Sequence, residues 1–243
     1  RYAPENTRDV LGWLEKDKKR VVNNSRALEL EISKKEQYKE LKKFNINYPE
    51  TYYAKDKKEI LEKAKNFTKP FITKHNRGGR GLGVKFFQNN SELEKYINGK
   101  FENSIDGVTL LQEYIESDPK IITRVEFVKG KFLYAVQVDA SEGFELCPAD
   151  ACNVEEKFCP TNPDGNKFMI LKDYKNPEIK KYENLLKSNG IEIAGIEYIK
   201  GKDGIHYTYD INTNTNYNSI AESKSNLKGM DSIATFLYNE LRK

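Results

Sequence analysis

A lysine followed by a glycine-rich segment is the most chemically informative feature of this sequence. Lys74 lies near the end of the run Phe71–His75, and the segment Arg77-Gly-Gly-Arg-Gly-Leu-Gly83 begins two residues later. Glycines let backbone N–H groups approach an anion closely, and a nearby lysine adds a positive charge. The residues that this pattern predicts to contact a phosphate-bearing ligand are Lys74, Arg77, Gly78, Gly79, Arg80, Gly81 and Gly83.

Three other known kinds of loop fit this segment less well. The Walker A pattern G-x-x-x-x-G-K-[ST] is absent. A protein-kinase glycine loop precedes its lysine, whereas Lys74 precedes this loop, and no H-R-D or D-F-G follows. The stretch 77–81 also resembles an RGG element of nucleic-acid-binding proteins, but those elements occur in repeated tracts and this one is single. An alternative that the sequence does not exclude is a hairpin loop that binds no ligand.

An acidic cluster near the C-terminus predicts a second site. Glu197 lies on one predicted strand, and Asp210 and Asn212 lie two residues apart on the next, where alternate side chains share a face. Three oxygen-bearing side chains suit a hard cation, and Mg²⁺ is preferred because it binds a few carboxylates together with substrate phosphates. The alternative is a polar, solvent-facing sheet surface. It is less favoured because both carboxylates stand among apolar residues, where an unpaired charge is costly.

The elements that must position these residues are mixed helices and strands. Capping boxes at Ser33-x-x-Glu36, Asp56-x-x-Glu59 and Ser91-x-x-Glu94 predict helix starts. The remaining expected elements are helices over 7–16, 176–190 and 230–241, strands over 71–75, 84–87 and 108–115, hairpins over 121–138 and 191–211, and a short strand around Val21 and Val22. Residues 140–175 show no organised pattern.

These elements predict an α+β protein with two lobes. We expect a remnant of an N-terminal domain over 1–33, a small lobe with the glycine loop over 34–107, and a larger lobe with the metal site over 108–243.

Composition limits the class of protein. The chain has 243 residues, 37% hydrophobic and 32% charged, with a net charge of +4, which indicates a folded domain rather than a disordered polyelectrolyte. No apolar run is long enough to cross a membrane. The odd number of cysteines, Cys147, Cys152 and Cys159, favours free thiols in the cytoplasm, and their spacing matches no common zinc pattern.

Further features accompany the two sites in a fixed order along the chain. Lys34 begins a helix, and Asn45-Ile-Asn-Tyr-Pro-Glu-Thr51 follows it. Leu110-Leu-Gln-Glu-Tyr-Ile115 and Thr123-Arg124-Val-Glu126 lie between the loop and the acidic cluster. In this order the parts resemble the ATP-grasp superfamily over about residues 34–225, and are most similar to RimK-type α-L-glutamate ligases.

The resemblance implies an ATP-grasp fold in which two α+β lobes enclose ATP. It implies that Lys34 and Lys74 bind phosphates, that Arg124 acts near the γ-phosphate and that Glu197, Asp210 and Asn212 bind Mg²⁺, with Mn²⁺ as an alternative. The adenine-binding segment would contain Gln112, Glu113, Tyr114 and Ile115, followed by Glu116 or Asp118 for ribose. Two departures are Ile122, where many members have an acid, and the lack of a proline after Asp210-Ile-Asn212.

The reaction implied is ATP-dependent C–N bond formation through an acyl phosphate, joining a small-molecule or peptide carboxylate to an amine such as glutamate or another amino acid. The resemblance allows a homo-oligomer, and the composition does not favour nucleic acid as a partner. Two alternatives stay open, namely other ATP-grasp chemistry of the carboxylase or carbamoyl-phosphate type, and a non-catalytic nucleotide- or RNA-binding module.

Overall fold

The structure of the protein, a computed structural model, describes residues 4–79, 83–140, 168–171, 174–217, 219–223 and 225–243. Arg80, Gly81 and the three cysteines lie outside the described residues, so the predictions for them stay predictions. No helix within the described ranges is long and apolar enough to cross a bilayer.

The first of two antiparallel sheets carries the lysine and the start of the glycine loop. Its strands are β1 (Thr51–Ala54), β2 (Phe71–His75), β3 (Lys85–Phe87) and β4 (Thr109–Glu113), in the order β1-β4-β2-β3. The apolar run of β4 is buried because this strand is central, between β1 and β2. Helices α4 (Lys57–Ala64) and α5 (Asn90–Asn98) pack on this sheet through an apolar core that includes Ile60, Leu93 and Phe71.

The second sheet carries the acidic cluster. Its strands are β5 (Ile121–Val128), β6 (Lys131–Asp139), β7 (Phe168–Leu171), β8 (Ile193–Lys200) and β9 (His206–Asn212), in the order β7-β6-β5-β8-β9. The β5–β6 turn consists of Lys129 and Gly130, with φ of +57° and +65°, as a tight hairpin turn requires. Both predicted hairpins are therefore present.

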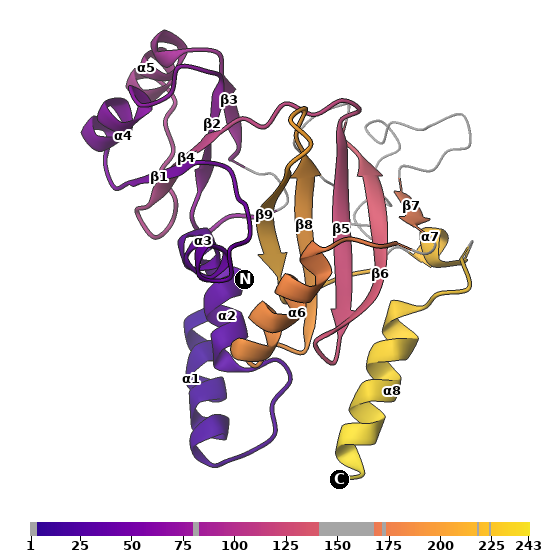
Figure 1. Cartoon of the computed structure of the whole chain (residues 1–243). Helices are drawn as coiled ribbons and strands as arrows, with labels where there is room; N and C mark the ends of the chain where they lie inside the picture. Colours follow the sequence, from indigo (N-terminus) through magenta and orange to yellow (C-terminus); the bar gives the residue numbers. More distant parts are fainter. Residues whose placement is uncertain (1–3, 80–82, 141–167, 172–173, 218, 224) are drawn as a thin grey trace.

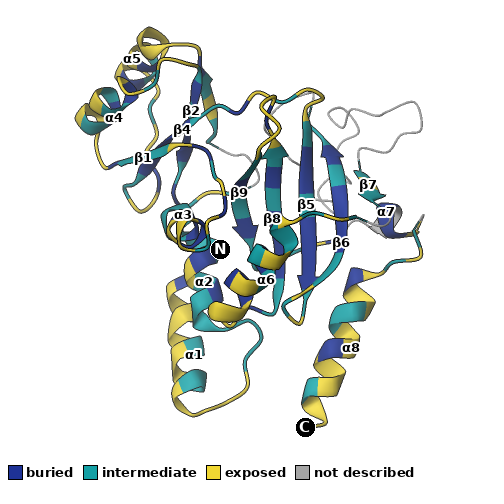
Figure 2. Cartoon of the chain, in the orientation of Figure 1, coloured by how far each residue is buried: buried dark blue, intermediate teal, exposed yellow. Residues whose placement is uncertain are grey.

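Helices cover one face of the second sheet and leave its other face more polar. Figure 1 shows α6 (Glu178–Ser188) lying across this sheet, where Tyr182, Leu185 and Leu186 pack against Val125 and Ile196. On the opposite face, Tyr134, Val136 and Tyr217 form a smaller cluster with part of α8 (Gly229–Leu241), which follows the short helix α7 (Ser219–Ser223). Figure 2 shows that most of α8 is exposed.

The N-terminal segment is built differently from our expectation. Helix α1 (Pro4–Lys16) agrees with the predicted helix, but the strand predicted around Val21 and Val22 is wrong, since the chain bends there and enters α2 (Ser25–Ile32). Two β-branched residues are a weak strand signal without a neighbouring strand to pair with. The side chain of Asn24 caps α2 by accepting a hydrogen bond from Ala27 N.

Helix α2 is part of the main core. Its Ala27 and Leu30 are fully buried together with Tyr38 and Leu41 of α3 (Lys34–Lys43) and residues of the second sheet. The main core therefore includes residues on both sides of the predicted boundary at 33/34.

Helix starts follow local capping chemistry, with one correction. Ser33 and Asp56 accept hydrogen bonds from Glu36 N and Glu59 N, as predicted. The box expected at Ser91 is wrong, because Asn89 accepts from Glu92 N and begins α5 two residues earlier. Asparagine caps a helix as well as serine does, so the sequence contains two possible N-cap residues here, Asn89 and Ser91.

We predict that Leu30→Ala lowers the free energy of unfolding by about 2–5 kcal/mol, because it empties a buried site in the core. Urea unfolding measures this change, with Leu241→Ala, a leucine that is 87% exposed, as the matched control expected to change stability by less than about 0.5 kcal/mol. A loss below about 1 kcal/mol for Leu30→Ala would mean that α2 is not part of the cooperative core.

Candidate functional site

Three charged side chains, an arginine and two carboxylates, form a row across neighbouring strands of the second sheet, which we call the acidic row. Arg124 of β5 stands directly opposite Glu197 of β8, and Glu197 stands opposite Asp210 of β9. Directly opposed residues point to the same face of a sheet, so the row lies on the face away from α6. Arg124 Nη1 donates to Glu197 Oε1 at 2.9 Å.

A bulge in β9 brings an extra side chain to this row. The register shifts between Glu197 and Tyr198, so that Asp210 pairs with Glu197 while Thr208 pairs with Tyr198. Tyr209 is the extra residue, and its hydroxyl donates to Glu197 Oε2 at 2.9 Å. Bulges commonly redirect side chains in this way next to functional sites. The alternation of side chains expected for a regular strand did not predict Tyr209 as a site residue.

Two lysines approach the row from the other elements. Lys34, the first residue of α3, donates to Asp210 Oδ1 at 2.6 Å. Lys74 of β2 is buried, and its ammonium group lies over the rings of Tyr38 and Tyr209, 5.2 Å and 5.9 Å from the centroids. The structure therefore brings together Lys34, Lys74 and the acidic row, which lie far apart in the sequence.

A buried hydrogen-bond network holds Lys74. Its Nζ donates to the hydroxyl of Tyr38, which donates in turn to the backbone oxygen of Tyr209. Gln112 Nε2 donates both to the Tyr38 hydroxyl, at 2.9 Å, and to Thr51 Oγ1, at 2.7 Å. The Gln112 side chain thus supports Lys74 from inside the first sheet, and Tyr38 is a site residue that the sequence did not reveal.

The charges of the site perturb one another. Burial, reinforced by the positive charge of Lys34, lowers the pKa of Lys74 well below its usual value. Burial by itself would raise the pKa of Asp210, but Lys34, Lys74 and Arg124 hold it below the usual range. Asp210 is therefore an anion at neutral pH, and two cationic groups crowd together where an anion would relieve their repulsion.

Arg124, which we predicted to act near the γ-phosphate, forms hydrogen bonds to several side chains of the protein. Besides Glu197, its guanidinium donates from Nε to Glu126 Oε1 and from Nη2 to Thr215 Oγ1. Burial would lower the pKa of Arg124, but Glu126 and Glu197 raise it above the usual value. Glu126, which is almost fully buried, and Thr215 were not expected as site residues, although Glu126 lies only two positions from Arg124 on the same strand face.

The oxygen atoms of Glu197, Asp210 and the nearby Asn212 suit a magnesium ion. Glu197 and Asp210 present carboxylate oxygens on one sheet face, and Asn212 lies two residues after Asp210 and accepts from Asn214 N at 2.9 Å through Oδ1. Hard oxygen ligands of this kind match Mg²⁺. Among the described residues, no group of three or more His, Cys, Asp and Glu side chains is arranged to hold a metal. A site here would therefore include the Asn212 amide.

The predicted adenine segment connects the two sheets. Its backbone is partly committed inside the protein, since Glu113 N donates to Glu50 O and Tyr114 N donates to Pro70 O. Ile115 is buried. Glu116 pairs with Lys202 on the β8–β9 turn at 2.8 Å, and Asp118 precedes a cis proline. No contact among the described residues joins Glu116 or Asp118 to the acidic row, so their ribose role stays a prediction.

The described part of the glycine loop is anchored at both ends. Asn76 accepts from Lys35 N through Oδ1 and donates to Asp106 Oδ2, which joins the loop to the start of α3. Gly83 has φ of +80°, and a Cβ there would lie 3.1 Å from the ring of His75. Arg77 pairs with Glu5 of α1 at 3.1 Å, while Gly78 is exposed and Gly79 is half-buried.

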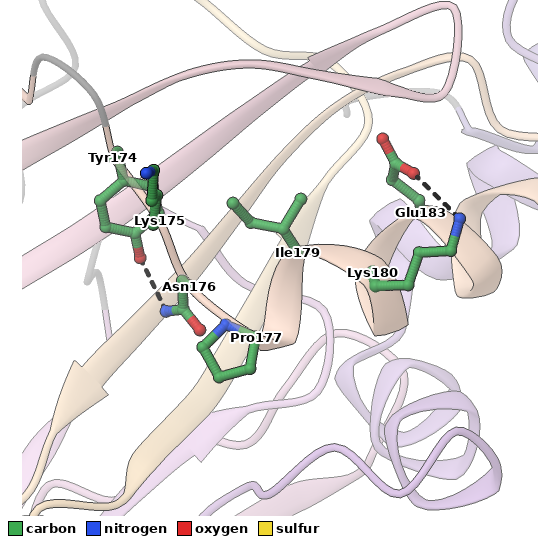
Figure 3. A pocket seen from close by; sticks show the side chains of 7 residues that line it. All are labelled: Tyr174, Lys175, Asn176, Pro177, Ile179, Lys180 and Glu183. Carbon is green, nitrogen blue, oxygen red and sulfur yellow. Dashed lines mark hydrogen bonds and ion pairs between the residues drawn. The ribbon is translucent and has the colours of Figure 1, made fainter.

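A depression elsewhere on the surface is separate from this site. It has a volume of 440 Å³ and lies at the start of α6, lined by Tyr174, Lys175, Asn176, Pro177, Ile179, Lys180 and Glu183 (Figure 3). Two interactions join residues that line it. Asn176 Nδ2 donates a hydrogen bond to the Tyr174 hydroxyl, and Lys180 forms an ion pair with Glu183. None of the predicted site residues lines it, and α6 belongs to the opposite sheet face.

Comparison with solved structures shows that the fold is that of ATP-grasp ligases. The RimK domain ATP-grasp protein of Sphaerobacter thermophilus is 15% identical, with a TM-score of 0.66, over 95% of this chain and 76% of that chain. A RiPP-associated ATP-grasp ligase of Chryseobacterium gregarium is 17% identical, with a TM-score of 0.65, over 97% and 68%. D-alanyl-alanine synthetase A of Vibrio cholerae is 12% identical, with a TM-score of 0.69, over 98% and 73%.

A family model described as the RimK-like ATP-grasp domain matches residues 32–153, half of the chain. The chain therefore belongs to the RimK-like ATP-grasp domain family. No curated protein matches the sequence at a significant level. The chain spans 68% to 76% of the three solved proteins, whose low identities establish the shared fold and no more.

We predict that Lys74→Met weakens the binding of an ATP analogue by about 10-fold or more, because a charge-assisted contact of roughly 1.5–3 kcal/mol is lost. Lys39→Met, in an ion pair on the exposed face of α3, is the matched control and should leave binding unchanged. Titration calorimetry measures both variants. Unchanged affinity in Lys74→Met would remove Lys74 from the phosphate site.

The same variant tests the charge of Lys74 in the free protein. Since the folded pKa of Lys74 is lowered, the unfolded chain binds this proton more tightly than the folded chain. The free energy of unfolding of the wild type should therefore rise relative to Lys74→Met as the pH increases from neutral toward about 10. Urea unfolding at several pH values checks this trend, and a falling difference would contradict it.

Proposed function

We propose that the chain is the ATP-binding catalytic part of a ligase that joins a carboxylate to an amine through an acyl phosphate. The main support for this proposal is that Lys34 and Lys74, which we expect to bind phosphates, lie next to the acidic row of Arg124, Glu197 and Asp210. Phosphoryl transfer needs cationic groups next to the phosphates and anionic oxygens that bind a metal ion. Both sets of groups must be in position before the substrate reacts. Family membership supports the same assignment.

In this proposal each residue of the site has a distinct task. Lys34 and Lys74 would exchange their present partners for phosphate oxygens of ATP, and the glycine loop would supply backbone N–H groups and exclude water. Glu197, Asp210 and Asn212 would hold Mg²⁺, which neutralises phosphate charge. Arg124 would face the transferred phosphoryl group. The substrate carboxylate would attack the γ-phosphorus of ATP, and the bond from that phosphorus to ADP would break. The amine would then attack the carbonyl carbon of the acyl phosphate, lose a proton and release inorganic phosphate.

The substrates belong to the same proposal at a finer level. The Chryseobacterium gregarium ligase was solved with ADP and a leader and core peptide, and a related ligase with a minimal precursor, Mg and ADP. The bound peptide supports a peptide carboxylate as the acceptor. We propose glutamate or another amino acid as the amine because of the resemblance to RimK-type ligases. We also propose a cytoplasmic location, exchange of Mg²⁺ for Mn²⁺ at the metal site, a homo-oligomer, and boundaries of the N-terminal remnant and the two lobes at 1–33, 34–107 and 108–243.

The first experiment is calorimetric titration of a non-hydrolysable ATP analogue into the protein, with and without Mg²⁺, followed by a screen for ADP release with carboxylates and amines. Mg-dependent binding and ADP release that requires both an amine and a carboxylate would support the ligase. Release that requires bicarbonate would favour carboxylase-type chemistry. Salt-sensitive RNA binding without nucleotide binding would overturn the proposal.

We predict that Asp210→Asn lowers ADP release at least about 100-fold, because it removes one anionic oxygen donor and leaves Lys34 without its ion-pair partner. The replacement is nearly isosteric, so the fold should persist, as circular dichroism can verify. Asp231→Asn, in which the original carboxylate is highly exposed on α8, is the matched control and should retain activity. Full turnover by Asp210→Asn would refute the assignment of Asp210 to the metal.

A further inference from the structure

The guanidinium of Arg124 lies directly over a glycine. A Cβ built on Gly195 of β8 would lie 2.5 Å from Arg124 Nη2, 2.7 Å from Nε and 2.8 Å from Cζ. These distances are far inside van der Waals contact, so any other residue at position 195 forces the guanidinium to move. Gly195 stands two positions before Glu197 and therefore on the same face of the sheet.

The same guanidinium is held by a closed ring of hydrogen bonds on its other side. Arg124 Nε donates to Glu126 Oε1, Arg124 Nη2 donates to the Thr215 hydroxyl, and that hydroxyl donates to Glu126 Oε2 at 2.9 Å. Thr215 therefore uses its hydroxyl as both acceptor and donor. The ring fixes the plane of the guanidinium and leaves Nη1 directed to Glu197.

Glu126 also changes the charge balance around Glu197. A buried ion pair is stable only when further hydrogen bonds satisfy its remaining polar groups. Here two carboxylates, Glu126 and Glu197, share the donors of one guanidinium. Glu197 is thereby oriented by Arg124 and still able to bind a second cation.

We infer that Gly195, Glu126 and Thr215 form a seat that positions Arg124, and through it Glu197, for the reaction. This inference rests on the proposed function, since the seat would hold the arginine of phosphoryl transfer and one of the metal ligands. The three are positioning residues, and none of them needs to touch the nucleotide. The seat joins β5, β8 and the segment after β9, three parts of the chain that lie far apart in the sequence.

The seat predicts that Gly195→Ala lowers kcat for ADP release by about 10-fold or more, while the protein stays folded at the assay temperature. The guanidinium is at the end of a flexible side chain and can turn away, which costs Glu126 its ion-pair partner, so the thermal unfolding midpoint should fall without loss of the fold. Thr215→Val should act similarly, and Thr215→Ser, which keeps the hydroxyl, should restore most of the activity.

A double-mutant cycle separates positioning from a general structural effect. In an Arg124→Ala background the obstruction is gone, so adding Gly195→Ala should change kcat by less than about twofold. An equal loss in both backgrounds would overturn the inference, because the glycine would then act independently of Arg124.

A spectroscopic measurement tests the seat without catalysis. The Arg124 Nε–H, buried against Glu126, should give a slowly exchanging ¹⁵N–¹H resonance, assigned by its loss in Arg124→Lys. Gly195→Ala should shift this resonance and speed its exchange with water, and an unchanged resonance would refute the seat. If the wild type releases no ADP while the resonance responds as expected, the proposed reaction fails and the seat itself stands.

Discussion

The need to pair buried charges between the two sheets governs the structure of the site. Lys34, Lys74 and Arg124 can carry three positive charges, and Glu126, Glu197 and Asp210 can carry three negative charges. Burial lowers the pKa of Lys74 and raises the pKa of Glu126, so the opposite charges in the cluster stay closely balanced. A buried charge without a partner costs several kcal/mol, whereas a complete network tolerates burial. The pair between Lys34 and Asp210 joins the start of α3 to β9, and Lys74 extends the network to the first sheet through Tyr38. The position of one lobe relative to the other therefore depends partly on electrostatics.

Departures from regular geometry serve this network. The bulge at Tyr209 allows two consecutive residues of β9 to contribute to the site, one hydroxyl on Glu197 and one carboxylate on Lys34. Gly195 interrupts a strand that otherwise favours larger residues, and the space it leaves is taken by the guanidinium of Arg124. Each departure weakens the sheet locally, as a bulge or a strand glycine does elsewhere. Both lie at the acidic row, where the network compensates for them.

Local signals in the sequence were sufficient for much of the fold. The cap at Ser33, the turn at Lys129-Gly130 and the apolar run of β4 depend on neighbours within a few residues, so the sequence alone predicted them correctly. The strand at Val21 and the helix start at Ser91 failed because each local signal was weak or had a close competitor. The short strands β1 and β7 were not predicted, since their pairing depends on distant strands.

The site shows the same division between local and distant information. The glycine loop and the pair Asp210 and Asn212 are patterns within a few residues, and the lysines could be placed by resemblance. Tyr38, Glu126 and Thr215 could not be predicted, because each acts through a partner from another element. Glu126 had the nearest signal, two positions from Arg124 on the same strand face. Its value depends on Thr215, 89 residues away, which no spacing rule connects to it.

The balance of opposite charges in the free site has a consequence for how the proposed ligands would bind. A polyphosphate alone would take Lys34 and Lys74 but leave Asp210 facing added negative charge. A divalent cation alone would take Asp210 but leave the two lysines without their counter-charge, where burial and then the charge of Lys34 already lower the pKa of Lys74. Each ligand supplies the charge that the other displaces, so the two should bind with positive coupling. Such coupling is an advantage for a phosphoryl-transfer site, because the nucleotide is then held mainly in the form that carries its metal.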